Sequence, residues 1–287
     1  MEFFNVKIIF LMKSDRLILF RILLLFFLVF ISMTLISLNI YGLTQTMDLG
    51  NLKAENLRFK DADVTLPKKM MRSGLLRLSN ESEQDYAKRA TRVIASGMAH
   101  IHWELYAPSR FHQTVPIWEN YILYAMGKWS GIPEFERYHF SSSEKSIERG
   151  IGICGDASIL LSQILNENGI KNHILTVPGH VMVEAHFSEE SLLLDPDFGV
   201  AFEKGVAYYH ENIEQLQKFY NAAGFVDNGE DVVVNGLKQR YRYWDGVSHF
   251  ITKKYYFEKF SYIAIWVLPL IVLILCFINY QKMMSKK

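Results

Sequence analysis

Two largely apolar stretches lie near the two ends of the chain, the first nearly unbroken from residue 22 to 38 and extendable to 43. Residues 22–43 and 261–280 are each long enough for a helix of about 20 residues, the length that crosses the hydrocarbon core of a bilayer. The second stretch carries Tyr262, Trp266 and Tyr280 at positions suited to the membrane interfaces. We therefore expect two transmembrane helices. A secretory signal peptide is the alternative for the first stretch, but no small-residue cleavage pattern follows it.

The region between these stretches begins with helical periods. Apolar residues at helical spacing predict helices over 83–103, 116–129 and 211–220. A further helix is predicted to begin at or just after Cys154 and to end at Asn168-Gly169, a common helix stop.

Three short extended runs follow that helix, over 171–176, 181–187 and 192–194. A Pro-Gly turn separates the first two runs, and a polar loop at 188–190 separates the second from the third, which is the pattern of an antiparallel hairpin. Because helices come first and strands afterwards, the pattern predicts an α+β fold with an antiparallel β-sheet.

The same patterns predict the order of the segments along the chain. They are a cytoplasmic N-terminal segment at 1–21, a transmembrane helix at 22–43, a polar stalk at 44–78, a folded domain at 79–260, a transmembrane helix at 261–280 and a cytoplasmic tail at 281–287. With 287 residues, half of them hydrophobic, the chain has room for one core domain besides the two spans.

Positive charges around the first span predict its orientation. Lys7, Lys13, Arg16 and Arg21 precede it closely, whereas only Lys53 and Arg58 follow within a similar distance. The positive-inside rule then places both termini in the cytoplasm. The folded domain is expected outside the cytoplasmic membrane, in a periplasm or extracellular space if the source is bacterial. The net charge of +1 offers no basic field for nucleic acid.

Cys154 is the first candidate for chemistry. Gly150 and Gly152 allow a sharp turn before it, and its place at a helix N-terminus favours the thiolate, the reactive form of cysteine. The other cysteine, Cys276, lies within the second apolar stretch. A lone thiol is a liability in an oxidising compartment, so Cys154 is easier to explain by chemistry than by packing.

His180 and Asp195 supply the other two groups that a thiol nucleophile needs. His180 begins the second strand and Asp195 ends the third, so the two are expected to lie nearly opposite across the hairpin. An Asp beside the imidazole fixes its tautomer and stabilises its charged form.

The motifs around these residues resemble the transglutaminase-like superfamily of papain-related folds. The matching pieces are Arg-Gly-x-Gly-x-Cys-x-Asp-Ala at 149–157, Gly-Ile at 169–170, Gly-His-x-x-x-Glu at 179–184 and Leu-Asp-Pro at 194–196. On this resemblance, Cys154 is the nucleophile, His180 the general base and acid, and Asp195 the orienting carboxylate. The implied fold is a papain-like core with N-terminal helices, a Cys-bearing helix and an antiparallel sheet. Gly155 stands where many relatives carry a larger residue.

Further residues are candidates for the oxyanion hole or the cleft. The peptide N–H of Cys154 is one oxyanion donor, and Trp118 is a second candidate by resemblance to transglutaminases, with Asn120 as the next choice. Glu184 shares a strand face with His180, and either lines the cleft or occupies an exposed position on the sheet. Asp156 is interpreted as a first-turn carboxylate that complements the helix dipole.

The expected reaction is attack of the Cys154 thiolate on an amide or peptide carbonyl, which forms a thioester. Release by water makes the protein a protease, amidase or deamidase, and release by an amine makes it a cross-linking transferase. No cofactor or metal is expected, and the expected partners are a protein or peptide amide, the lipid bilayer and cell-envelope proteins. The alternatives are a non-catalytic binding module in a membrane or cell-envelope polysaccharide assembly complex, and a metal-dependent hydrolase.

Overall fold

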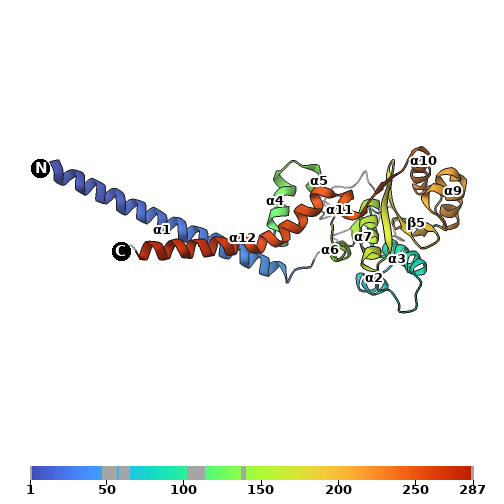
Figure 1. Ribbon diagram of the computed structural model, residues 1–287, viewed down its shortest axis with the longest axis horizontal. Helices are drawn as coiled ribbons and strands as arrows, with labels where there is room; N and C mark the ends of the chain where they lie inside the picture. Colours follow the sequence, from blue (N-terminus) through green and yellow to red (C-terminus); the bar gives the residue numbers. More distant parts are fainter. Residues whose placement is uncertain (1, 47–56, 58–64, 102–113, 137–139, 286–287) are drawn as a thin grey trace. The chain divides into compact units, whose positions relative to one another are not determined.

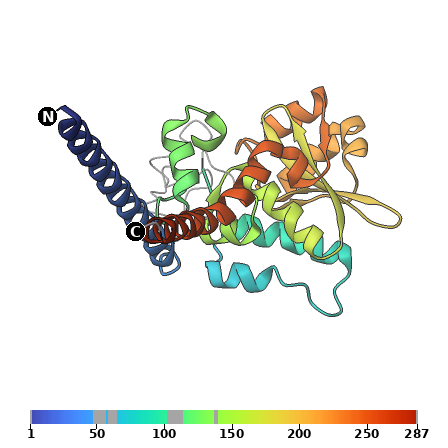
Figure 2. The same cartoon turned by 60° about the vertical axis from the view of Figure 1, so that its left-hand side comes forward.

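A computed structural model describes residues 2–46, 57, 65–101, 114–136 and 140–285. The chain divides into two compact units. The helical unit comprises 1–45, 115–126 and 259–287, and the α+β unit comprises 46–114 and 127–258. Figures 1 and 2 show the elements of both.

The described residues form twelve helices and seven strands. The helices are α1 (Glu2–Gly42), α2 (Lys68–Gly74), α3 (Glu83–Gly97), α4 (Tyr121–Trp129), α5 (Pro133–Glu136), α6 (Ser143–Arg149), α7 (Cys154–Glu167), α8 (Val206–Glu211), α9 (Ile213–Ala222), α10 (Glu230–Gln239), α11 (Gly246–Phe250) and α12 (Thr252–Met284). The strands are β1 (Ala99–His100), β2 (Ile151–Gly152), β3 (Lys171–Val177), β4 (His180–His186), β5 (Ser191–Asp195), β6 (Val200–Ala201) and β7 (Arg242–Trp244).

The α+β unit is built on a five-stranded antiparallel sheet in the order β6-β5-β4-β3-β7. The α+β class and the three consecutive strands β3, β4 and β5 are confirmed. The strand β7 was not predicted, because its three residues lie in an aromatic, basic approach to the second apolar stretch and have no period of their own. It adds to the free edge of β3, where Leu175 pairs with Tyr243.

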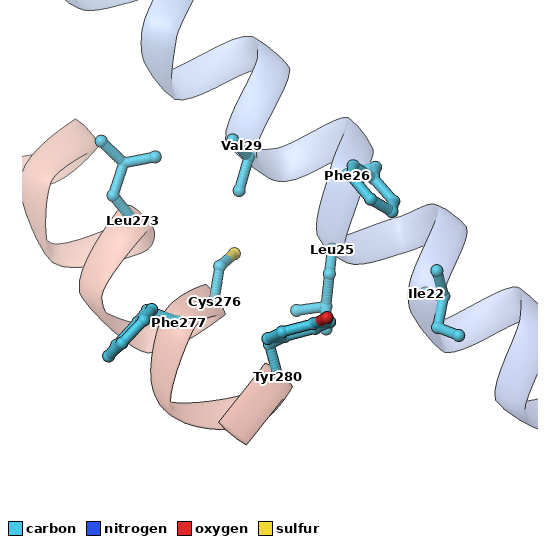
Figure 3. Close-up of a pocket in the computed structure, with 8 residues that line it drawn as sticks. All are labelled: Ile22, Leu25, Phe26, Val29, Leu273, Cys276, Phe277 and Tyr280. Carbon is cyan, nitrogen blue, oxygen red and sulfur yellow. The ribbon is translucent and has the colours of Figure 1, made fainter. Parts of the chain in front are cut away.

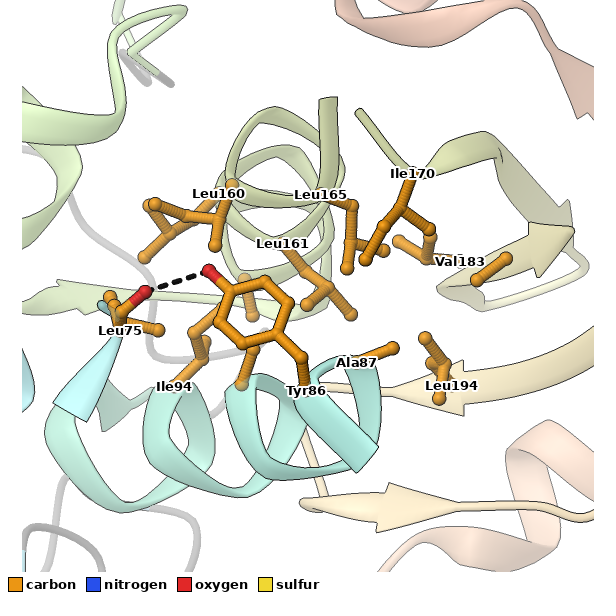
Figure 4. Close-up of a cluster of buried hydrophobic side chains, with 14 of the residues drawn as sticks. Leu75, Tyr86, Ala87, Ile94, Leu160, Leu161, Leu165, Ile170, Val183 and Leu194 are labelled. Atoms are coloured by element: carbon orange, nitrogen blue, oxygen red, sulfur yellow. Dashed lines mark hydrogen bonds between the residues drawn. The ribbon is translucent and has the colours of Figure 1, made fainter. Parts of the chain in front are cut away.

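One face of the sheet packs on α7 and α3. Leu160, Leu161 and Leu165 of α7 contact Val183 and other aliphatic residues of the strands in a fully buried cluster. Figure 4 shows this cluster, with α3 below α7 and the strands beside them. The only ring among its buried members is that of Tyr86, whose hydroxyl donates to the carbonyl of Leu75 at 2.7 Å. Burial of these side chains is the main force that fixes α7 on the sheet.

The opposite face of the sheet packs on α8, α9 and α10, and Figure 1 shows α7 and α9 on its two sides. Here aromatic rings join the aliphatic side chains of the core. Ring contacts with centroids 5.1–5.9 Å apart link α8 and α9 to each other and to the segment that follows β5. The rings are those of Phe198, Phe202, Tyr209, Phe219 and Tyr220. Two helical layers therefore enclose one sheet.

Two predicted helices have different ends in the structure. The helix expected over 83–103 ends at Gly97, because the chain turns there into β1, which pairs with β2. The end of that prediction, from residue 102, lies outside the described residues. The helix expected from 116 begins at Tyr121, because the Asn120 side chain accepts from the backbone N–H groups of Ile122 and Leu123 and so caps α4.

The predicted stalk at 44–78 and the predicted helix at 211–220 also differ from the structure. Helix α2 lies inside the stalk range, and its Met71 is fully buried in the cluster under α7, so the folded unit begins before residue 79. Helix α2 has only seven residues, and its apolar residues are two adjacent methionines. The sequence therefore shows no helical spacing of apolar positions that would predict it. The helix expected over 211–220 is α9, and the shorter α8 precedes it.

The helical unit contains two helices that are long and apolar enough to cross a membrane, over Ile18–Gly42 and Thr252–Met284. They include the two stretches predicted as spans. Pro269 lies inside α12 and has no N–H for the carbonyl of Ile265. That carbonyl instead accepts from the Asn39 side chain at 2.7 Å and from the Tyr121 hydroxyl at 3.1 Å. The break in α12 is therefore filled by polar groups from α1 and α4.

An apolar pocket of about 390 Å³ lies between α1 and α12 within the helical unit (Figure 3). Its lining residues are Ile22, Leu25, Phe26, Val29, Leu273, Cys276, Phe277 and Tyr280. The predicted interface residue Tyr280 lines this pocket, as does Cys276.

Candidate functional site

Cys154 is the first residue of α7 and is a free, half-buried thiol. Gly150 ends α6 with φ of 62°, the left-handed region that favours glycine. A side chain at Gly152 would collide with Asp156, whose Cβ lies 2.4 Å from the place of the missing Cβ. The two glycines therefore have separate roles, one in turning the chain and one in letting α7 approach.

Asp156 fixes the start of α7. It is buried, and its carboxylate accepts the backbone N–H of Ile153 at 3.0 Å. This is the reach of a third helical residue back to the N-cap, so the predicted role of Asp156 at the helix start is confirmed. As the first residue of α7, Cys154 has a peptide N–H that finds no acceptor within the helix, as an oxyanion donor requires.

His180 and Asp195 lie together as predicted. The sheet pairs Val183 with Leu194, and one more step in this register sets Asp195 opposite Met182, diagonal to His180 on the same face. The imidazole Nε2 and Asp195 Oδ2 are 2.8 Å apart, and both side chains are buried. Since Asp195 engages Nε2, Nδ1 is the ring nitrogen left to exchange a proton with a thiol.

Three further hydrogen bonds hold the Asp195 carboxylate. Its Oδ1 accepts the backbone N–H groups of Asp197 at 3.0 Å and Phe198 at 3.3 Å, and its Oδ2 accepts the hydroxyl of Tyr220 at 2.6 Å. Sequence reasoning missed Tyr220, because a tyrosine on α9, 25 residues from Asp195, carries no local signal of that contact. These bonds satisfy both oxygens of the fully buried carboxylate and fix its orientation towards His180.

Cys154 and His180 interact, and this contact completes the group of three. Burial by itself lowers the pKa of His180, but the charges of Asp195 and Cys154 and side-chain hydrogen bonds to both outweigh it. The net result is a pKa well above the ordinary value for histidine. A protonated imidazole beside a thiol is the arrangement that activates the sulfur in thiol enzymes.

Open space lies next to the sulfur-bearing residue. A Cβ added to Gly155 would meet no atom within 4 Å. A small side chain at this buried position would therefore meet no clash within that distance.

Glu184 is neither exposed nor part of this group. It is 3% exposed, and its carboxylate accepts the backbone N–H of Val206 at 2.7 Å and the hydroxyl of Tyr243. The expectation of an exposed position is therefore wrong. The partners of Glu184 come from α8 and β7, which indicates a role in joining these elements to β4.

Trp118 and Asn120 belong to the helical unit, and their predicted role as oxyanion donors stays a prediction. Asn120 is fully buried, and its amide nitrogen donates to the hydroxyl of Ser261 on α12 at 3.0 Å. Trp118 is partly exposed, and its backbone carbonyl packs closely on Gly42 at the end of α1.

The part of the chain that the structure describes contains no group of three or more His, Cys, Asp or Glu side chains placed to hold a metal ion. Comparisons with protein-family models, curated proteins and solved structures found no match for this chain. Its function must therefore be argued from its own residues.

Proposed function

We propose that the protein is a membrane-anchored thiol enzyme of the transglutaminase-like type that acts on an amide or peptide carbonyl. The observation that carries the proposal is the arrangement of three side chains: a half-buried thiol at a helix N-terminus, a histidine in contact with it, and a buried carboxylate 2.8 Å from that histidine. Such a group supplies a nucleophile, a general acid and base, and an orienting carboxylate.

The chemistry follows from these positions. The Cys154 sulfur adds to the carbonyl carbon, and the carbonyl oxygen becomes an anion that the peptide N–H of Cys154 can stabilise. His180 gives its proton to the departing amine as the carbon–nitrogen bond breaks, which leaves a thioester on Cys154. Neutral His180 then removes a proton from water or from an acceptor amine, whose attack breaks the carbon–sulfur bond and returns the thiol.

The proposed anchor is the pair of apolar helices. They suggest association with a membrane, and with the positive charges before the first of them they support a two-pass topology with both termini in the cytoplasm. The catalytic domain would then lie in a periplasm or extracellular space. A protein or peptide there is the proposed substrate.

The proposal is tested by alkylating the full-length protein in detergent micelles with iodoacetamide between pH 5 and pH 9. Cys154→Ala is the matched control, because it reports any alkylation of Cys276. We expect fast labelling of Cys154 below pH 7, loss of that labelling in His180→Ala, and capture of membrane proteins by a glutamine or peptide electrophile only when Cys154 is present.

Two outcomes would overturn the proposal. A Cys154 thiol that labels with the pH dependence of an ordinary cysteine, in wild type and His180→Ala alike, favours a non-catalytic binding module in a cell-envelope assembly complex. Probe hydrolysis that chelators abolish and alkylation leaves intact indicates a metal-dependent hydrolase.

A further inference from the structure

A second buried pair of histidine and carboxylate lies next to the first. His100 Nδ1 and Asp197 Oδ1 are 2.8 Å apart, and the two residues are 2% and 1% exposed. His100 comes from β1, far from the motif in sequence, whereas Asp197 follows Asp195 by two residues. Nothing in the proposed reaction uses either side chain.

Both ring nitrogens of His100 face oxygen acceptors. Nδ1 faces the Asp197 carboxylate, and Nε2 faces the backbone carbonyl of Ala95 at 3.0 Å. A neutral imidazole has one N–H and one lone pair, so it can satisfy only one of these acceptors. With Asp197 ionised, the geometry therefore favours the imidazolium, and the pair is then a buried ion pair.

Asp197 is connected to His180 through the turn that carries Asp195 and Phe198. The backbone N–H of Asp197 donates to Asp195 Oδ1 at 3.0 Å, and the ring of Phe198 packs edge-on against the His180 ring with centroids 5.7 Å apart. Residues 195–198 thus form one turn that both hydrogen-bonds and packs against His180. A bond from His100 to Asp197 holds this turn in place.

His100 is connected, through the pairing of β1 with β2, to the segment that precedes Cys154. In the two-stranded parallel sheet, His100 lies opposite Gly152. Its neighbours Ala99 and Ile101 donate their backbone N–H groups to the carbonyls of Gly150 at 2.9 Å and Gly152 at 3.1 Å. These are the two glycines that bring the chain to the nucleophile.

We propose that His100 is a positioning residue that joins the loop carrying Cys154 to the turn carrying Asp195, through its ion pair with Asp197. This inference rests on the proposed function. It adds that the distance between sulfur and imidazole is set by a residue outside the Cys-His-Asp group. Displacement of a reacting group by about 1 Å can slow a reaction on the order of 10²-fold. Loss of the contact between His100 and Asp197 should therefore have a measurable effect on the rate.

The test uses the full-length protein with the substitution Cys276→Ala, so that Cys154 is its only thiol, in detergent micelles. The variants are His100→Gln, Asp197→Asn and the double variant, and the control is His210→Gln, which changes an exposed histidine of α8 whose ring bonds to the carbonyl of Leu237. Each single change leaves one buried charge without its counter-charge, whereas the double change leaves none. We expect each single variant to slow alkylation at pH 6 on the order of 10-fold to 100-fold, and the double variant to recover part of that loss.

Two readouts separate positioning from a general loss of stability. In the single variants, the pH midpoint of alkylation should move upward, which a lower melting temperature alone would not cause. In the wild type labelled with ¹⁵N-histidine, nuclear magnetic resonance should find a proton on both ring nitrogens of His100 at pH 7. The second readout needs no variant to fold.

The outcomes distinguish this inference from the proposed function. A Cys154 thiol that is unreactive in the starting protein overturns both. A reactive thiol whose rate and pH midpoint are unchanged in His100→Gln and Asp197→Asn overturns the role of His100 alone, and so does a ring nitrogen of His100 that carries no proton at pH 7.

Discussion

The two faces of the central sheet are built from different residues and contribute differently to the site. The face under α7 is packed almost entirely with aliphatic side chains, whereas the face under α9 combines aliphatic side chains with several aromatic rings. Cys154 begins the helix on the first face, whereas His180 and Asp195 project with Met182 on the second. The contact between thiol and imidazole therefore depends on both layers staying in place.

This difference has a physical reason. Aliphatic side chains pack densely without polar atoms and so provide a scaffold of fixed shape. Tyrosine adds a hydroxyl to a large apolar ring, so the aromatic layer can both fill volume and bond a buried carboxylate. Tyr220 does this for Asp195. The first face is expected to control stability, and the second to control stability and reactivity together.

The largest effects are expected from matched core truncations. Leu160→Ala under α7 and Leu216→Ala under α9 remove the same atoms from fully buried sites. Each should lower the free energy of unfolding by about 2–5 kcal/mol, measured by denaturant titration in micelles. Only Leu216→Ala should also slow alkylation of Cys154, because Leu216 lies one turn from Tyr220 on α9. Equal slowing in both variants would contradict the division between the faces.

Substitution of the two buried strand carboxylates sharpens the comparison. Asp195→Asn should slow alkylation at pH 6 about 10²-fold, because His180 loses the carboxylate that orients it and raises its pKa, and a neutral, misoriented imidazole no longer activates the thiol. Glu184→Gln should leave the rate within about twofold, because its partners are Val206 and Tyr243. Both variants should lower the melting temperature. A comparable loss of rate in Glu184→Gln would place that residue in the site after all.

Two buried tyrosines allow a finer test. Tyr220→Phe removes a bond to Asp195, and Tyr86→Phe removes bonds to the carbonyl of Leu75 and the amide of Asn168. Each should cost about 1–3 kcal/mol of stability, since a buried partner loses its hydrogen bond. Alkylation should slow several-fold in Tyr220→Phe and stay unchanged in Tyr86→Phe. The proposed role of the aromatic face fails if Tyr220→Phe keeps the wild-type rate and pH midpoint.

The smallest effect on stability is expected when alkaline pH ionises Tyr86, which lies in the aliphatic face. Burial raises the pKa of Tyr86 to about 12. The ionised form is thus disfavoured in the folded state, and the stability that Tyr86 contributes is complete below the ordinary tyrosine pKa of about 10. It is lost as pH rises from there toward 12. Thermal unfolding of wild type should fall more steeply over this window than that of Tyr86→Phe, and parallel curves would argue against the effect.

Local patterns were sufficient to predict much of this fold. The helix at Cys154 and strands β3 to β5 have clear periods, and turn residues between them set the pairing of His180 with Asp195. Those contacts span few residues, so spacing along the chain is enough to place them. The apolar stretches at the ends were equally visible by length.

The rest depends on contacts between distant segments. The three residues of β7 become a strand because β3 has a free edge, and α2 forms a helix because Met71 is buried beside α3. Tyr220 and His100 bond to carboxylates 25 and 97 residues away. No periodicity encodes such partners, since each is chosen by tertiary packing.

The hydrogen bonds that Asn39 and Tyr121 make to the Ile265 carbonyl, which Pro269 leaves without its helical partner, affect how the two apolar helices assemble. If the two helices span a membrane as proposed, the carbonyl of Ile265 has no water there to replace Asn39 and Tyr121, and each unmet polar group would cost several kcal/mol. Separating α1 from α12 would expose that carbonyl together with the Asn39 amide. The carbonyl left open by Pro269 thus stabilises the pairing of the two helices, and in the proposed membrane setting this stabilisation would be larger than in water.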